Sequence, residues 1–119
     1  MTEIDAWTTI IERYVTLCCV LETPPRVSEL AQLIGVSTVT LGRQARRHYV
    51  ALAKELKDAQ LARAQGMLRI TEESMTRIAY ACGFGTRRTF FRTFQRAVGM
   101  TPAQYRESMR DDDRTQTSQ

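Results

Sequence analysis

The side chains with the clearest chemistry in this chain are its arginines. Fifteen of the 17 cationic residues in the 119-residue sequence are arginine. A guanidinium group pairs with a phosphate, or with the O6 and N7 atoms of guanine, through two parallel hydrogen bonds. Residues 74–106 contain no carboxylate, whereas solvated helix surfaces usually mix both signs of charge. This segment, predicted to contact double-stranded DNA, carries six arginines: Arg77, Arg87, Arg88, Arg92, Arg96 and Arg106.

The arginines near residue 90 share one side of a predicted helix. At about 100° per residue, residues 87–98 place apolar residues on one side and Arg88, Thr89, Arg92 and Arg96 on the other. The apolar side consists of Phe90, Phe91, Phe94, Ala97 and Val98. A helix that lies in a major groove presents its N-terminal residues to base edges and its later cations to phosphates. We therefore predict base contacts for Arg88, Thr89 and Arg92, and phosphate contacts for Thr86, Arg87 and Arg96.

A similar pattern precedes this one by roughly 49 residues. Residues 31–36 (AQLIGV) and 79–84 (AYACGF) both place a small residue four positions before a glycine and an apolar residue after it. This spacing is typical of a helix-turn-helix, because the small residue lets two helices cross closely and the glycine adopts the positive φ of the turn. On the helix after the first turn, outward positions fall on Val39, Arg43, Arg46 and Arg47. Phosphate contacts are predicted for Ser37, Thr38, Arg46 and Arg47.

The elements that must position these residues are all predicted to be helices. A first helix runs from about residue 2 or 3 to Leu21 and ends before the proline pair at 24–25, and its cluster around Tyr14 to Val20 is expected to face the core. Residues 51–68 lack proline and turn signals, which predicts a connecting helix about 27 Å long. About seven helices are expected in all. The first lobe covers residues 1–50, the linker helix 51–68 and the second lobe 69–109, with helices over 70–82 and 86–98 in the second lobe. Residues 110–119 are expected to form a disordered tail.

Several classes of protein are not supported by the composition. Cys18, Cys19 and Cys82 form no C-x-x-C pair and are expected to be structural thiols, and His48 is expected on the inner side of its helix, so no metal and no cofactor is predicted. The sequence shows no paired carboxylates, no nucleophile with a histidine beside it and no phosphate-binding loop, so an enzyme is not predicted. The longest apolar run, residues 15–21, is too short to span a membrane, and no leader precedes it, so a cytoplasmic, nucleoid-associated location is expected.

Three linked motifs closely resemble the DNA-binding domain of the AraC/XylS family of bacterial transcription regulators. They are residues 78–84 (IAYACGF), 90–94 (FFRTF) and 98–106 (VGMTPAQYR), and the resemblance covers about residues 5–108. It implies an all-α domain with two helix-turn-helix units joined by a long helix. It also implies binding to double-stranded DNA as a monomer and activation of transcription beside RNA polymerase. The family's base-reading positions fall on Val39, Gly42, Arg43, Arg88, Thr89 and Arg92.

The first unit departs from the family pattern. Gln44 and Ala45 stand where members usually carry two large apolar residues, and residues 48–51 (HYVA) replace the usual glycine turn. Gly42 supplies no side chain, so this unit is expected to position the protein more than to specify sequence. The alternative function is a protein-interaction module that binds RNA polymerase or another regulator. A small stand-alone regulator and a piece of a larger one both remain open.

Overall fold

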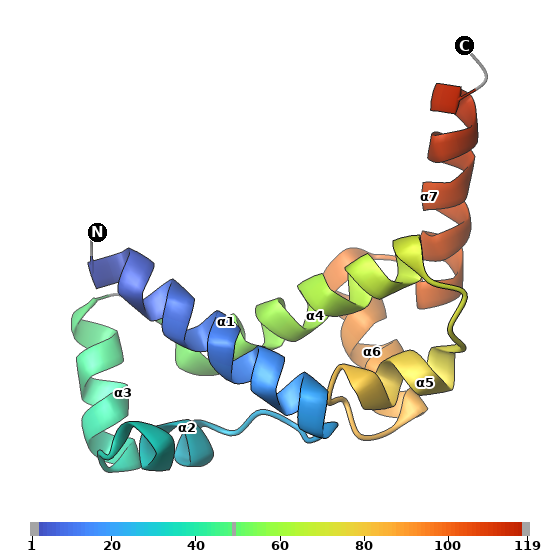
Figure 1. The fold of residues 1–119 in the computed structure, drawn as a ribbon. Coiled ribbons are helices and arrows are strands. Elements are labelled where there is room, and N and C mark those ends of the chain that lie inside the picture. Colours follow the sequence, from blue (N-terminus) through green and yellow to red (C-terminus); the bar gives the residue numbers. More distant parts are fainter. Residues whose placement is uncertain (1–2, 49, 118–119) are drawn as a thin grey trace.

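The computed structural model describes residues 3–48 and 50–117, and this part of the chain contains helices and no strands (Figure 1). The predicted all-α class is therefore confirmed. The helices are α1 (Glu3–Leu21), α2 (Val27–Ile34), α3 (Thr38–Arg47), α4 (Leu52–Ile70), α5 (Met75–Ala81), α6 (Arg87–Val98) and α7 (Pro102–Thr117). Residue 2, named as a possible helix start, and Tyr49 lie outside the described residues.

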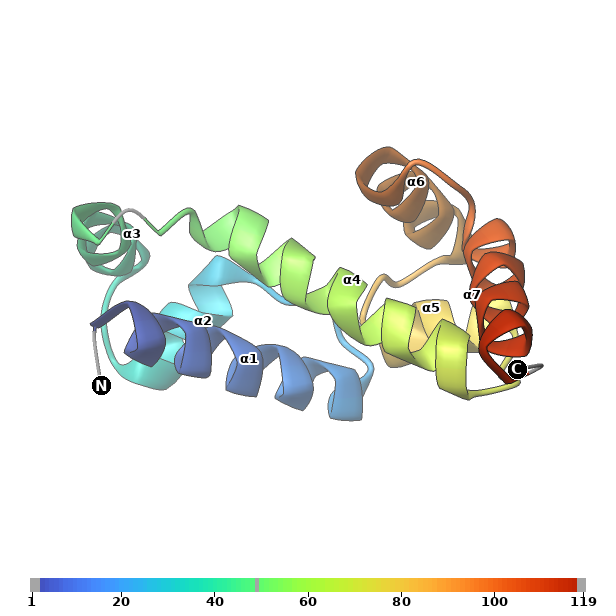
Figure 2. The ribbon, with the colours of Figure 1, turned by 90° about the horizontal axis from the view of Figure 1, so that it is seen from above.

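The molecule is elongated along α4. Its principal extents are 51 × 31 × 23 Å and its radius of gyration is 16.1 Å, whereas a sphere-like chain of this length has a radius of gyration of about 13.5 Å. The 19 residues of α4 span about 28 Å. Helices α2 and α3 lie at one end of this rod and α5, α6 and α7 at the other (Figures 1 and 2).

Helix α1 braces the first helix-turn-helix through Tyr14. The Tyr14 hydroxyl accepts a hydrogen bond from the N–H of Arg26 at 2.9 Å and donates one to Glu29 Oε1 at 2.8 Å, just before and within α2. Burial, together with the Glu29 hydrogen bond, raises the pKa of Tyr14 above its ordinary value. Leu17 and Val20 are predicted to face the core with Tyr14, but they are 43% and 71% exposed, because the helices that pack on α1, mainly α4 and α5, leave this side of it uncovered.

Both helix-turn-helix turns close with the same backbone hydrogen bond. The N–H after each turn glycine donates to the alanine carbonyl five residues earlier: Val36 to Ala31 at 3.0 Å, and Phe84 to Ala79 at 2.9 Å. This bond is the signature of a helix end that turns through a left-handed residue. Gly35 and Gly83 supply that residue, with φ values of 91° and 77°. The duplication inferred from the sequence is thus present in the backbone.

The second turn also forms the junction between the two lobes. A Cβ atom added to Gly83 would lie 2.6 Å from the carbonyl oxygen of Thr23, just beyond α1. Beside it, buried Gln60 of α4 donates from Nε2 to the carbonyl of Cys82 at 3.0 Å. The end of α1, the middle of α4 and the second turn therefore meet at one point.

The second lobe is built on aromatic packing. Phe90 and Phe94 are fully buried, and Phe90 packs against Phe84, Phe91 and Phe94 with ring centroids 5.1 to 6.2 Å apart. Tyr105 of α7 adds an edge contact to Phe94 at 5.5 Å. These edge and tilted arrangements suit the charge distribution of aromatic rings. Helix α6 is therefore anchored along its inner side.

Three boundaries differ from the sequence prediction. The linker helix continues to Ile70, so the next helix does not begin there but at Met75, with Ser74 accepting the N–H of Arg77 as its N-cap. Helix α7 begins as predicted, with Thr101 and Gln104 exchanging backbone and side-chain hydrogen bonds. It then continues to Thr117, so residues 110–117 are helical rather than disordered. No proline or glycine interrupts this stretch, and Arg110 pairs with Glu72 at 2.6 Å.

The three cysteines are buried free thiols, in agreement with the structural role predicted for them. Cys19 of α1 and Cys82 face each other at the junction. Their mutual hydrogen bond, helped by the nearby guanidinium of Arg63, lowers the pKa of Cys19, and the same contact together with burial raises the pKa of Cys82.

The junction predicts unequal costs for the same substitution in the two turns. Gly35→Ala meets nothing within 4 Å and should lose about 1–2 kcal/mol of unfolding free energy, because alanine resists positive φ. Gly83→Ala should lose about 1–3 kcal/mol more, because its methyl group collides with Thr23. Urea denaturation followed by circular dichroism measures both. Equal losses would contradict the close approach.

Candidate nucleic-acid interface

The two reading helices, α3 and α6, begin with the same cap. Ser37 Oγ accepts from the N–H of Thr40 at 3.0 Å and donates to its hydroxyl at 2.9 Å. Thr86 Oγ1 accepts from the N–H of Thr89 at 3.0 Å and donates to its hydroxyl at 2.9 Å. Each cap fixes the first turn of its helix, where unpaired N–H groups and the positive end of the helix dipole favour an anion.

The outer side of α6 matches the helical-wheel prediction, whereas Ala97, predicted on the inner side, is exposed near the end of the helix. The residues predicted to contact DNA are all exposed, while Phe90 and Phe94 on the opposite side are buried. Arg87 lies with its guanidinium carbon 5.2 Å from the centre of the Phe91 ring, a cation–π contact that holds this side chain at the edge of the helix. The exposed set is Thr86, Arg87, Arg88, Thr89, Arg92 and Arg96.

The outer side of α3 is open as well, with one local difference. Val39 is 66% exposed, and Ser37, Thr38, Arg43, Arg46 and Arg47 are also exposed. Gly42 is half-buried, and a Cβ atom at this position would lie 3.8 Å from Nη1 of Arg46. The guanidinium of Arg46, one helical turn later, therefore lies beside the glycine. On the inner side, Leu41 and Ala45 are buried, and half-buried His48 lies 6.3 Å from the ring of Trp7.

The two reading helices lie at different places along α4, with α3 beyond its start and α6 beside its second half. In Figure 2, α3 and α6 occupy one edge of the molecule, each seen nearly along its axis, while α1 lies on the other side of α4. The two helices are thus roughly parallel. Among residues 6–48 and 50–112, whose side chains the structure describes, no carboxylate forms an ion pair with Arg43, Arg88 or Arg92. These guanidinium groups are available to an external anion.

Two hollows border the reading helices. One of about 540 Å³ lies between α3 and the start of α4, and its lining includes Thr38, Gly42, Arg46 and Lys54. A second of about 210 Å³ lies between α4, α6 and the loop after α1, and its lining includes Lys57, Gln60, Thr89 and Thr93. Lys54 and Lys57 of α4 could not be identified from the sequence, because only the folded arrangement shows that they adjoin the hollows beside α3 and α6, where Lys57 meets Thr93 of α6.

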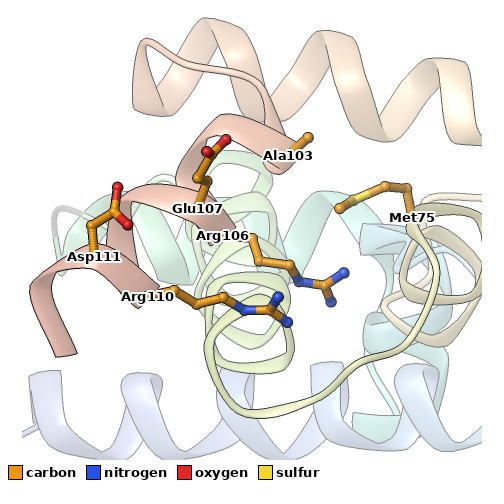
Figure 3. Close-up of a pocket in the computed structure, with 6 residues that line it drawn as sticks. All are labelled: Met75, Ala103, Arg106, Glu107, Arg110 and Asp111. Carbon is orange, nitrogen blue, oxygen red and sulfur yellow. The ribbon is translucent and has the colours of Figure 1, made fainter. Parts of the chain in front are cut away.

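A third hollow, of about 340 Å³, lies away from the reading helices, between α7 and the start of α5 (Figure 3). Arg106 and Arg110 project toward the end of α4, where Arg106 Nε donates to the carbonyl of Leu68 at 3.0 Å. Glu107 and Asp111 line the same hollow and point away from those guanidinium groups. Arg106, the last arginine of the carboxylate-free segment, therefore caps the linker helix rather than adding to the reading surface.

Other kinds of site receive no support. No group of three potential metal ligands occurs among the described residues. Nor does any helix in that part of the chain have the length and apolar character needed to cross a membrane. Two exposed, arginine-bearing helices, each following a glycine turn, define a DNA-binding protein with paired helix-turn-helix units.

Comparison with known proteins identifies the family. A family model described as a helix-turn-helix domain matches residues 30–108. The transcriptional activator RhaS of Enterobacter sp. (strain 638) is 35% identical over 79 residues, which cover 66% of this chain and 28% of that protein. The urease operon transcriptional activator of Escherichia coli is 30% identical over 80 residues, covering 67% of this chain and 27% of that protein. This chain thus spans less than a third of the length of either relative.

Solved structures agree in fold. The DNA-binding domain of AdpA, solved in complex with a target DNA, has a TM-score of 0.73 at 26% identity and covers 86% of this chain and 94% of that one. An AraC-type regulator from Chromobacterium violaceum has a TM-score of 0.66 at 26% identity and covers 85% and 86% of the two chains. The chain belongs to the AraC/XylS family of DNA-binding transcription regulators, as its motifs predicted. That family consists of regulators, not enzymes.

The caps of the reading helices can be tested directly. Thr86→Ala removes the acceptor of the Thr89 N–H and should lower the free energy of unfolding by about 1 kcal/mol. Thr86→Ser keeps the hydroxyl and should retain most of the stability. Thermal unfolding of the three proteins gives the comparison, and an unchanged Thr86→Ala variant would show that this cap does not stabilise α6.

Proposed function

We propose that this chain is a sequence-specific regulator that inserts α3 and α6 into successive major grooves of double-stranded DNA. The observation that carries the proposal is the exposure of Arg88 and Arg92 on α6 and of Arg43 on α3, none of them paired with a carboxylate among the residues whose side chains the structure describes. Successive major-groove segments on one side of a duplex lie about 34 Å apart. A linker helix of about 28 Å, with a lobe at each end, supports this spacing.

In this proposal α6 supplies most of the base reading. Arg88 and Arg92 bind guanine O6 and N7, and Thr89 contacts a thymine methyl group or a phosphate. The stacking of Arg87 on Phe91 directs its charge to the backbone beside the groove. Arg96, one turn after Arg92, binds a phosphate, and Thr86 lies at the helix start, where the unpaired N–H groups of the residues after it bind another.

Helix α3 reads less and positions more. Its base-facing residues are Val39, Gly42 and Arg43, and its phosphate contacts are Ser37, Thr38, Arg46 and Arg47. Val39 offers a methyl surface and Gly42 no side chain, so only Arg43 can form a bidentate pair with a base. Arg46, lying beside Gly42, fills the position with positive charge and supports backbone binding.

The same proposal includes activation of transcription beside RNA polymerase, binding of one copy per site, and a cytoplasmic, nucleoid-associated location. Two relatives, the RhaS protein and the urease operon regulator, are named as transcriptional activators. The alternative, an interaction module without sequence reading, depended on a degenerate first unit. Ala45 and Leu41 are nevertheless fully packed and the Ser37 cap is intact, which favours DNA binding by both units.

Arg92→Ala should weaken binding to the preferred duplex by about 1–3 kcal/mol, or roughly 5- to 150-fold, and relax the choice of base at one position. The matched control is Arg13→Ala, which removes the same charge from an exposed position of α1, the helix across the linker from α6. A randomised-duplex selection finds the site, and fluorescence anisotropy measures the affinities. Equal losses in both variants, or no selected site, would favour the interaction module.

Phosphate contacts predict a steep dependence on salt. For roughly 6–10 contacts, the binding constant should fall by about 10³ to 10⁵ between 50 and 200 mM monovalent salt. Anisotropy titrations of the selected duplex at several salt concentrations give the slope. A nearly flat response would argue against the assignment of Arg46, Arg47, Arg87 and Arg96 to phosphates.

A further inference from the structure

The surface between the two reading helices is itself built for an anion. Two of the hollows in the described part of the chain touch α3 or α6, and two others lie away from both helices. The two that touch α3 or α6 are lined by cations, hydroxyls and apolar groups without any carboxylate. The other two include Glu12, or Glu107 and Asp111. Electrostatic suitability for phosphate therefore coincides with contact to the reading helices.

The first two turns of α4 separate these two hollows. Lys54 borders the hollow beside α3 and Lys57 the hollow beside α6, and they are the only lysines in the chain. In Figure 2 this part of α4 lies between α3 and α6. Lys54 pairs with Asp58 at 2.7 Å, whereas exposed Lys57 forms no ion pair within the described part of the chain.

We propose that Lys57, with the hydroxyl of Thr93, binds a DNA phosphate in the stretch of backbone that crosses between the two major-groove segments. This inference rests on the proposed function. When α3 and α6 occupy successive major grooves, the surface between them faces the intervening minor groove and its phosphates. An ammonium group on a flexible stem suits a single phosphate, and a threonine hydroxyl adds a donor. The hollow of about 210 Å³ gives that phosphate oxygen a place to enter.

The contact would carry no base information and would act as a spacer. It lies on the linker rather than on either reading helix, so it fixes where the backbone passes between the two half-sites. Lys57 is thus a third point of attachment, independent of the sequence read by α3 and α6.

Lys57→Gln tests the assignment on the full chain. The slope of log K against log salt should become shallower by about 0.9, so that the wild type loses about 3.5-fold more affinity than the variant between 50 and 200 mM salt. Base preference in the randomised selection should stay the same. Arg13→Gln on the far side of α4 is the matched control and should leave the slope nearly unchanged. Circular dichroism melting curves of all three proteins verify folding.

Neutral methylphosphonates, placed one at a time along the selected duplex, locate the phosphate. One position between the two half-sites should weaken the wild type and leave Lys57→Gln unaffected. If both proteins respond alike at every central position, or the slopes are equal, the Lys57 site is wrong although the proposed function stands. If the wild type selects no duplex, the proposed function itself fails.

Discussion

The arrangement of the reading surface depends on a close approach between two stretches of backbone. The turn at Gly83 can meet the carbonyl of Thr23 only because position 83 has no side chain. Gln60 completes the junction with its hydrogen bond to Cys82, and its burial excludes water from that bond. Since α1 belongs to the first lobe and the turn to the second, this contact helps to set the angle between the lobes, together with the pairs Glu22–Arg77 and Cys19–Cys82. The placement of α3 and α6 at the two ends of α4 depends on that angle.

The ion pairs of the described residues leave the outer side of α6 free. Two ion pairs lie away from the reading helices: Glu22, just after α1, with Arg77 of α5, and Glu72 with Arg110 of α7, while Lys54 and Asp58 pair within α4. The absence of acidic residues from 74–106 leaves the outer side of α6 without an internal partner. Exposed pairs of this kind stabilise a fold weakly, so their main effect is to occupy charges that are not needed for binding.

The sequence predicted what local rules determine. Small-residue and glycine spacing identified both turns, hydroxyl residues marked the starts of α3 and α6, and the wheel separated Phe90 and Phe94 from Arg88 and Arg92. Features that depend on contacts between helices were either missed or predicted wrongly. Leu17 and Val20 have the apolar character of core residues, yet no helix covers them. The extension of α7 involves a contact of Arg110 with Glu72, 38 residues away in the sequence. The place of Lys57 beside α6 depends on the arrangement of α4 in the folded chain.

The empty position at Gly42 shows how the two halves can diverge in what they recognise. A Cβ atom at this position would stand 3.8 Å from Arg46 Nη1, so a methyl group fits beside the guanidinium. In the proposed complex, a substitution at position 42 would thus add a new shape to the amino-terminal reading helix, while the buried aromatic rings hold the carboxy-terminal one unchanged.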